Sequence, residues 1–230
     1  DPDNEYVVPY AAGTPLIVYD PARVDVEITG YASLWDPSLK DSLVLMKDMR
    51  NLYGMTFKAA GKSLNTADKE SIDAATEKLI ELVPNIRKLD YDTPHDAMIS
   101  GEATVGYMFT PQVAWAISQR PDLKVVYPEE GMGFGIDGFV VPVNAPNKAN
   151  AMIFLNYILD GKRSAELSEF TQYMNCVTTA KQYLSEDYLN NPALYIPSEV
   201  LGNTEFMQDV GTEATAWMDE GWTKFMNSFK

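Results

Sequence analysis

The sequence is poor in the residues that most often build catalytic and metal centres. Its 230 residues include one cysteine and one histidine. A single cysteine excludes an internal disulfide and any cysteine-based zinc site. A histidine-dependent catalytic triad or a histidine-rich metal site could use only His95. We therefore expect no metal site and no cofactor.

Basic residues are also scarce. The chain has 18 lysines and arginines against 33 aspartates and glutamates, a formal net charge of −15. A nucleic-acid surface needs clustered lysine and arginine to neutralise phosphates, so this balance argues against nucleic acid as a partner. The acidity could attract cationic ligands, although a solvated acidic surface is its commoner explanation. No apolar run approaches the ~18 residues that a membrane-spanning helix requires.

The usual enzyme signatures are missing from the chain, including the G-x-S-x-G elbow, the Walker loop, H-E-x-x-H and C-x-x-C. The glycine-rich segment 131–135 resembles a phosphate loop, but the residues after it have the pattern of a strand. A phosphate loop needs a helix N-terminus at that point. His95 follows a turn with Pro94, which favours a surface residue at the start of a helix over a catalytic base. Cys176 is interpreted as a small, buried or half-exposed hydrophobic residue.

The chain is rich enough in apolar residues to fold around a core. Hydrophobic residues make up 46% and aromatic residues 11%, which excludes a disordered chain. The length suits one large domain or two small ones. The sequence opens with Asp1 and carries no methionine or signal-like stretch there, so we expect a processed chain or an excised fragment.

Strand and helix patterns alternate along the chain. Strands are predicted at 5–10 (broken by Pro9), 14–19, 42–46, 103–109, 123–127 and 133–142. Helices are predicted at 48–60, 68–83, 112–119, 148–159, 162–170 and from Val210 to the end. Thr66 or Asp68 can cap the helix at 68–83. This alternation predicts an α/β protein with a largely parallel sheet.

Two carboxylates stand at informative places. Asp48 follows the buried strand at 42–46, and ligands of open α/β sheets bind at the carboxyl ends of strands. Asp is also an ideal helix N-cap, and position alone favours that role. Asp137 lies in a glycine-rich apolar run, where a charge needs an ion pair, a backbone amide or a cationic ligand.

Aromatic residues lie next to these strand ends and could attract an ammonium group at ~0.5–2 kcal/mol each. They are Tyr10, Phe109, Phe134 and Tyr173. Most aromatic residues of such a protein simply fill its core, so these four prove nothing by themselves.

Segments spread over the whole chain resemble one known family. They are Asp1–Tyr10, Tyr31–Pro37, Ser42–Leu45 with Asp48 and Arg50, Thr66–Glu70, Glu81–Asn85, Tyr127–Gly131, Asp137, Pro142, Ala145, Asn147–Lys148 and Gln208–Gly211. In order and spacing they resemble the spermidine/putrescine-binding proteins of polyamine ABC importers.

The resemblance implies a periplasmic-binding-protein-like fold of two α/β lobes with the ligand in the cleft between them. It implies that this chain begins near the first crossover, without most of the first lobe. The expected divisions are a crossover strand at 1–12, the second lobe at 13–136, a segment returning to the first lobe at 137–172, and a C-terminal part at 173–230 that packs on the second lobe. The hinge is expected at 8–12, Asp137 and Tyr173.

The resemblance also implies a ligand site. Its mapped positions are Asp48, Asn51, Phe109, Gly135, Asp137, Tyr173, Met207 and Gln208. Asp48, Asp137 and Tyr173 match the family pattern. The other positions depart from it: Asn51 replaces an acid, Phe109 and Gly135 replace tryptophans, and a glutamine position falls on Met207 with Gln208 beside it. These departures put spermidine-like affinity in doubt.

The function implied is a non-enzymatic solute-binding component of an ABC importer for putrescine, spermidine or similar cations. Its partners would be permease subunits, and its location the periplasm or the outer face of the membrane. One alternative is another small solute, such as an amino sugar or a carboxylate, although the acidity and the absence of an arginine at the mapped site oppose an anion. Others are a carboxylate-based hydrolase, with two acids at a short separation, and an interaction module.

The segment 137–172 also predicts self-association. Its strand at 139–143 and its helix at 148–159 carry many apolar residues that an intact two-lobed protein would cover. Exposed apolar patches of that kind exceed what monomers normally tolerate.

Overall fold

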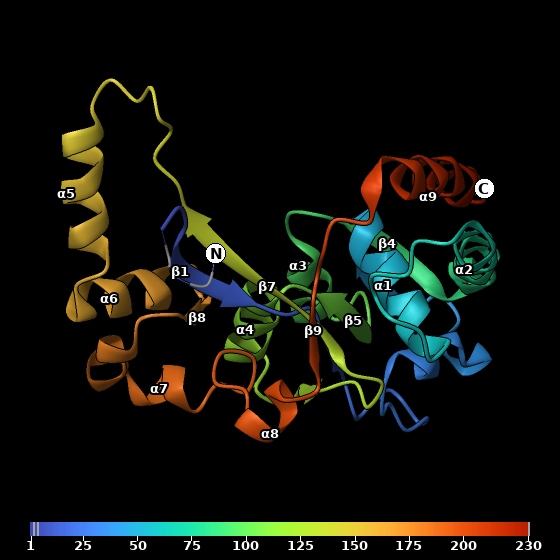
Figure 1. Ribbon diagram of the computed structural model, residues 1–230. Helices are drawn as coiled ribbons and strands as arrows, with labels where there is room; N and C mark the ends of the chain where they lie inside the picture. The colour runs from blue at the N-terminus through green and yellow to red at the C-terminus, as the bar shows by residue number, and fades with distance from the viewer. Residues whose placement is uncertain (2, 4, 230) are drawn as a thin grey trace.

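A five-stranded sheet organises the larger part of the molecule (Figure 1). The computed structural model describes residues 1, 3 and 5–229. The sheet has the order β4-β3-β5-β2-β6. Its strands are β2 (Leu16–Tyr19), β3 (Leu43–Met46), β4 (Ile86–Asp90), β5 (Val105–Met108) and β6 (Lys124–Val126).

The pairing of neighbouring strands gives their directions in this sheet. β3 pairs in parallel with β4 and with β5, and helices form the connections that parallel neighbours require. β2 pairs antiparallel with both β5 and β6. Four strands therefore run in one direction and β2 runs against them, so the prediction of a largely parallel sheet is confirmed. Strand β4 was not predicted, because Arg87 and Lys88 interrupt its apolar pattern.

Helices cover both faces of this sheet, and alternate strand residues point to opposite cores. Leu43 and Leu45 of β3 pack in one core with α1 (Met49–Ala59), α2 (Lys69–Leu82) and α9 (Gly211–Asn227). Val44, between them, packs in the other core with α3 (Pro94–Ile99) and α4 (Thr110–Gln119). The apolar run of β3 is thus buried on both faces, as predicted.

A second sheet has the order β8-β1-β7-β9. Its strands are β1 (Val8–Gly13), β7 (Met132–Phe139), β8 (Met174–Asn175) and β9 (Thr204–Phe206). β1 runs antiparallel to β7 and β8, and Ala11 pairs with both Asp137 and Asn175. The prediction that the first strand breaks at Pro9 was wrong. β1 continues to Gly13, because an irregularity after Pro9 shifts its register on β7 without ending it.

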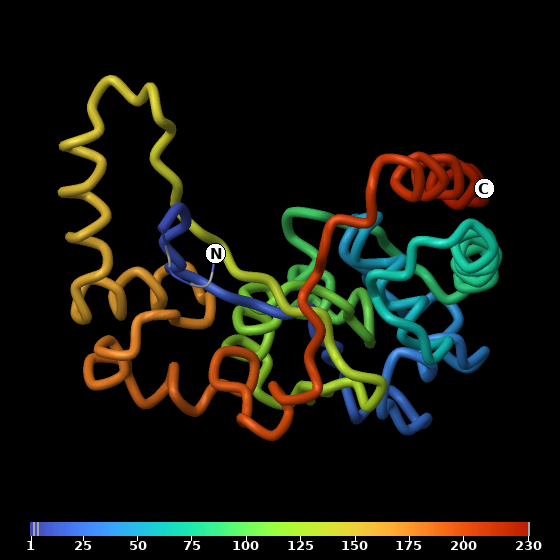
Figure 2. The backbone as a smooth tube through the Cα atoms, viewed as in Figure 1, coloured from blue at the N-terminus to red at the C-terminus, as the bar shows by residue number. Residues whose placement is uncertain are grey.

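The segment after β7 extends away from the five-stranded sheet (Figures 1 and 2). It contains α5 (Lys148–Ile158) and α6 (Gly161–Thr171), and the chain then returns through β8, α7 (Glu186–Leu189) and α8 (Ser198–Leu201). Large apolar side chains are exposed along the outlying part: Val140, Val143, Met152, Ile153, Phe154, Tyr157 and Phe170. The outlying segment therefore exposes an apolar surface made by many large side chains.

Helix α9 packs closely on α2 and α1 at Gly221. The hydroxyl groups of Tyr53 and Thr76 hydrogen-bond at 2.6 Å beneath this glycine, and a β-carbon at Gly221 would overlap both.

We predict that Gly221→Ala lowers the free energy of unfolding by about 1–3 kcal/mol, although alanine is the better helix former. Urea denaturation measures this. Glu220→Ala, at an exposed neighbouring position, should change stability by less than ~0.5 kcal/mol. A stabilising Gly221→Ala would contradict the close packing.

The exposed apolar face of 140–170 leads to a prediction about the chain in solution. We expect the chain to self-associate through this face, because water contact with so many large apolar side chains is unfavourable. Light scattering at micromolar concentration should show a mass above 25.7 kDa. The double substitution Ile153→Lys and Phe154→Lys, at exposed positions of α5, should restore the monomer. A monodisperse monomer of the unsubstituted chain would count against self-association.

Candidate functional site

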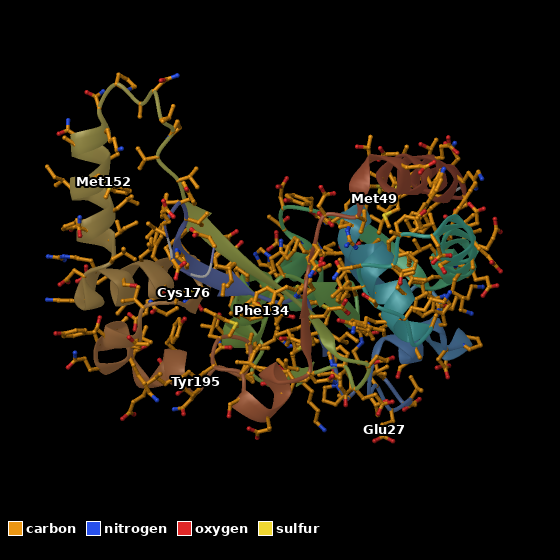
Figure 3. The ribbon with its side chains drawn as sticks, in the orientation of Figure 1. Glu27, Met49, Phe134, Met152, Cys176 and Tyr195 are labelled. Carbon is orange, nitrogen blue, oxygen red and sulfur yellow. The ribbon has the colours of Figure 1, made fainter. Side chains whose placement is uncertain are left out.

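A cavity of about 190 Å³ lies where the ends of β3 and β5 meet the second sheet. It is lined by Gly13, Thr14, Pro15, Asn51, Phe109, Thr110, Gly133, Phe134, Gly135, Asp137, Tyr173 and Met207. Six of the eight positions predicted from the sequence are among them. The two that lie outside the lining are Asp48 and Gln208. Figure 3 shows Phe134 in the middle of the molecule, between the α1 side and the α6 side.

The carboxyl ends of neighbouring parallel strands bring Asn51 and Phe109 together. Asn51 lies in the first turn of α1, which follows β3, and Phe109 directly follows β5. The Phe109 N–H donates to the Gln112 side chain at 3.0 Å. The Thr110 hydroxyl donates to the carbonyl of Thr14 at 2.8 Å and accepts from its N–H at 2.9 Å. These bonds fix the start of α4 and the β1–β2 connection against each other.

Asp48 is the N-cap of α1. Its carboxylate accepts the backbone N–H of Asn51 at 2.8 Å and the side-chain N–H of Asn51 at 2.9 Å. It is half-buried and does not line the cavity. Its role as a helix cap is therefore evident, and through the second bond it orients the Asn51 amide, which does line the cavity. Asp68 caps α2 in the same way, through the N–H of Ser71.

Asp137 is the carboxylate of the cavity. Its side chain is exposed, and within residues 1, 3 and 5–229 it has neither an ion pair nor a side-chain hydrogen bond. Of the partners expected for the Asp137 charge, an ion-pair residue or a backbone amide is thus not found among the described residues. Burial raises the pKa of Tyr173, and the nearby Asp137 charge raises it further. The same two causes raise the pKa of Tyr10.

Gly135 leaves room in the cavity, because a β-carbon there would meet no atom within 4 Å. Met207 continues β9, and its N–H donates to the carbonyl of Phe134 at 3.4 Å. The side chain of Gln208 is exposed, whereas its backbone binds Asn65 and Arg50 at 2.8 and 3.3 Å. Gln208 therefore anchors the chain beside the cavity and does not line it.

Glu205, on β9, strengthens this anchor. Its carboxylate binds Lys58 at 3.0 Å and accepts the side-chain N–H of Asn65 at 3.0 Å and a hydrogen bond from Ser63. Burial opposes ionisation, but Ser63, Lys58 and the backbone N–H of Leu64 together hold the pKa of Glu205 below its ordinary value. The network holds β9, and with it Met207, against the loop after α1.

A second cavity, of about 400 Å³, adjoins the first. It is lined by Tyr91, Asp92, Phe109, Pro111, Gln112, Trp115, Asp137, Thr171 and Tyr173, and so shares Phe109, Asp137 and Tyr173 with the first. Tyr91 and Asp92 are not among the positions predicted from the sequence, because the strand that precedes them was not predicted. The signal in the sequence would have been Asp92, an acid two residues after the end of a strand at Asp90.

His95 is less exposed than predicted. Its side chain is only 13% exposed and packs on Trp115, with 5.3 Å between the ring centroids. Its Nδ1 atom is buried and has no hydrogen-bond partner among the described residues. The prediction of a surface residue was wrong, because the short helix α3 turns the ring inward against α4. Its place at the start of a helix was predicted correctly.

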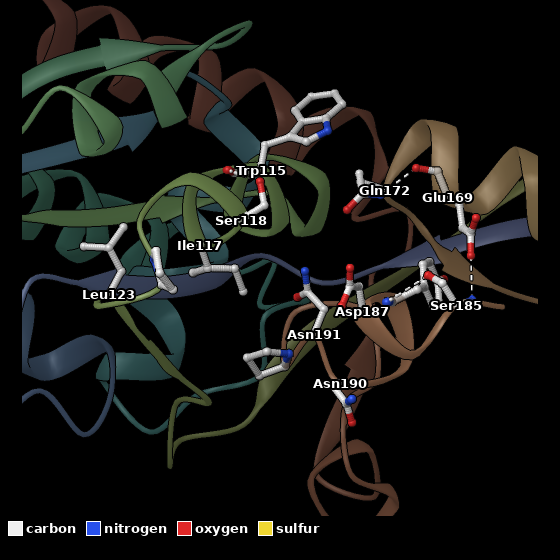
Figure 4. Close-up of a pocket in the computed structure, with 13 residues that line it drawn as sticks. Trp115, Ile117, Ser118, Leu123, Glu169, Gln172, Ser185, Asp187, Asn190 and Asn191 are labelled. Atoms are coloured by element: carbon white, nitrogen blue, oxygen red, sulfur yellow. Dashed lines mark hydrogen bonds between the residues drawn. The ribbon is translucent and has the colours of Figure 1, made fainter.

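A larger cavity lies elsewhere. It measures about 740 Å³ and lies between α4 and the segment from α6 to α7 (Figure 4). Two of its acids are Glu169 and Asp187, and the Glu169 carboxylate already accepts the N–H of Ser185 at 2.6 Å. This cavity is away from the carboxyl ends of β3 and β5, where the predicted residues lie. The cavities of about 190 and 400 Å³ therefore form the candidate site.

Neither a metal-binding group of side chains nor a membrane-spanning helix is found among the described residues. In this part of the chain, no group of three or more histidine, cysteine, aspartate or glutamate side chains is placed to hold a metal ion. Among the same residues, no helix combines the length and hydropathy needed to cross a bilayer.

Comparison with known proteins gives a consistent result. Residues 2–196 match the family model described as bacterial extracellular solute-binding protein. The spermidine/putrescine-binding periplasmic protein of Salmonella typhimurium is 33% identical over 225 residues, which cover 97% of this chain and 64% of that protein. The putrescine-binding periplasmic protein PotF of Escherichia coli is 26% identical and matches 97% of this chain and 65% of its own length. The chain thus spans a little under two thirds of these relatives.

A solved structure is similar to the fold as a whole. The spermidine/putrescine ABC transporter substrate-binding protein PotD of Streptococcus pneumoniae superposes with a TM-score of 0.86 at 26% identity. The match covers 99% of this chain and 70% of that one. The expected α/β binding-protein fold is confirmed.

The capping bonds of Asp48 lead to a prediction. Asp48→Ala should lower the free energy of unfolding by about 1 kcal/mol, because the first turn of α1 loses its cap. Asp48→Asn should lower it by less than ~0.5 kcal/mol, because asparagine caps equally well. Chemical denaturation of both variants measures the difference. Equal losses in the two variants would show that the charge, and not the cap, stabilises this helix.

Proposed function

Because the chain belongs to the family of bacterial extracellular solute-binding proteins, we propose that its site binds a polyamine such as putrescine or spermidine for an ABC importer. The observation that carries the proposal is the exposed Asp137 carboxylate in a cavity walled by Phe109, Phe134 and Tyr173. An ammonium group bound there would gain a charged hydrogen bond and contact with aromatic faces. The relatives are named as spermidine/putrescine-binding and putrescine-binding proteins, which supports polyamines as the ligand class.

The chain contributes a lobe and a hinge to this function. We assign 13–136 and 173–230 to one lobe and 137–172 to a segment of the other, with the crossings at 1–12, Asp137 and Tyr173. The pairing of Ala11 with Asp137 and Asn175 supports this assignment, because three segments that lie far apart in the sequence run side by side there. Small backbone changes at such a site can swing one lobe over a bound ligand.

The side chains of the cavity bear on the ligand's size and affinity. Asn51 offers an amide where the related pattern has an acid, and Asp48 is occupied as a cap and orients that amide. Phe109 and the space at Gly135 make the aromatic wall less complete than two tryptophans would. We therefore propose weaker binding than a site with two acids and two tryptophans would give.

Binding suits the geometry better than hydrolysis. A carboxylate-based hydrolase needs two acids at a short separation across one cleft. Asp137 is the one acid in the lining of the first cavity, and Asp92 joins it only in the second, so the first cavity by itself lacks the acid pair. The relatives are binding proteins of transport systems, so the permease subunits of an importer are the proposed partners. The proposed location is outside the cytoplasmic membrane, in the periplasm where the cell has one.

Calorimetric titration with putrescine and spermidine tests the proposal. Asp137→Asn should weaken binding by about 2–5 kcal/mol, because it leaves a desolvated ammonium without its charged partner. Phe109→Ala should cost less, about 1–3 kcal/mol, because it removes wall area and one aromatic face. Asn51→Asp should strengthen spermidine binding. A Phe109→Ala loss larger than that of Asp137→Asn would contradict the role of Asp137.

A further inference from the structure

We propose that the second cavity is a subsite for the terminal ammonium group of a polyamine longer than a diamine, with Asp92 as its carboxylate. The inference rests on the proposed polyamine-binding function and extends it to the choice between ligands. Neither the family resemblance nor the mapped positions include Asp92.

The sheet places Asp92 at the same edge as the first cavity. β4, β3 and β5 are neighbours and run in parallel, and Asp90 at the end of β4 pairs with Met46 at the end of β3. The residues that follow these strands therefore emerge side by side. Asn51 follows β3, Phe109 follows β5 and Asp92 follows β4. Three consecutive strand ends thus supply one continuous site.

Hydrogen bonds fix the turn that carries Asp92. The Asp90 carboxylate accepts the N–H groups of Asp92 and Thr93 at 3.0 and 3.1 Å. The Gln112 side chain donates to the carbonyl groups of Tyr91 and Asp92 at 2.9 and 3.3 Å. Because the same Gln112 side chain accepts from the Phe109 N–H, one residue joins this turn to the wall of the first cavity.

The two acids of the turn have different environments. Asp90 binds Lys88 at 2.8 Å, and this hydrogen bond is the main reason why the pKa of Asp90 is lowered. The Asp92 carboxylate is exposed and, among the described residues, has no ion pair and accepts no side-chain hydrogen bond. Asp90 therefore holds the turn, and the charge of Asp92 is available to a ligand in the second cavity.

Aromatic rings surround the space between Asp92 and Asp137. Tyr91 and Phe109 meet edge to face with centroids 6.2 Å apart, and Trp115 and Tyr173 complete the lining. Tyr91 is 54% exposed and Trp115 38% exposed, so their rings are accessible to a ligand. Carboxylates at the ends and aromatic surface along the sides match a chain of methylenes between ammonium groups.

The polar groups that line each cavity bear on the length of the ligand. In the first cavity Asp137 is the carboxylate of the lining, since Asp48 caps α1 and Asn51 is neutral. Asp137 also lines the second cavity, so a ligand held by it can extend into that cavity toward Asp92. A triamine held in the first cavity by Asp137 and the Asn51 amide oxygen has a further ammonium group that can reach Asp92, whereas a diamine held by these two groups has none.

The test compares spermidine with putrescine by calorimetric titration of the whole chain. Asp92→Asn should weaken spermidine binding on the order of tenfold and putrescine binding by a clearly smaller factor, so that the ratio of the two affinities falls. Tyr91→Leu, which removes an exposed aromatic face, should lower the same ratio by a smaller factor. Asp25→Asn is the matched control, because it removes one exposed charge that lines neither cavity.

Failure of the subsite differs from failure of the proposed function. If the unsubstituted chain binds both ligands and Asp92→Asn leaves the affinity ratio within twofold, the subsite is overturned and polyamine binding stands. An equal fall of the ratio in Asp25→Asn would also overturn it, because the effect would then come from net charge. If the unsubstituted chain binds neither ligand, both proposals fail.

Discussion

The alignment of three parallel strand ends is the constraint on which the candidate site depends. β3 and β5 are buried between two layers of helices, and β4 pairs with β3 at the edge of the sheet, so the register of the three strands fixes where their carboxyl ends lie. Each strand then passes directly into a turn or helix whose first residues face the second sheet. Asn51, Phe109 and Asp92 therefore have fixed positions although none of them is in a strand.

The second sheet supplies the other side of the site. β1 and β7 cross from the large sheet toward α5 as an antiparallel pair, with Gly13 opposite Gly135 and Ala11 opposite Asp137. Small residues at these positions keep the crossing thin, so the cavity stays open between the strands and Phe109. Asp137 remains exposed at this crossing, where a charged side chain can exist without a protein partner because solvent or a ligand can reach it.

Acidic residues serve two distinct purposes around the site. Asp48 and Asp90 bind backbone N–H groups and shape the turns after β3 and β4. Asp137 and Asp92 take no such part within the described residues, and they line the cavities. The strongly negative composition therefore conceals a division between carboxylates that build local structure and carboxylates that are free to attract a cation.

The sequence by itself determined the class of the fold and most of its elements. Periodicity and caps are local properties, so β3, α2 and α9 could be predicted from the residues alone, and Asp68 caps α2 as expected. The resemblance added the positions of the site, six of which line one cavity. The position of Asp48 at a helix start favoured a cap, whereas the resemblance made both Asp48 and Asp137 ligand positions. Only the tertiary structure showed that Asp48 caps α1 outside the cavity while Asp137 lines it, because the lining depends on how the two sheets meet. The tertiary structure alone also revealed β4 and the residues after it, Tyr91 and Asp92. The charged residues of β4 break the apolar pattern of a strand, and the pairing with β3 that stabilises β4 is not visible in the segment's own sequence.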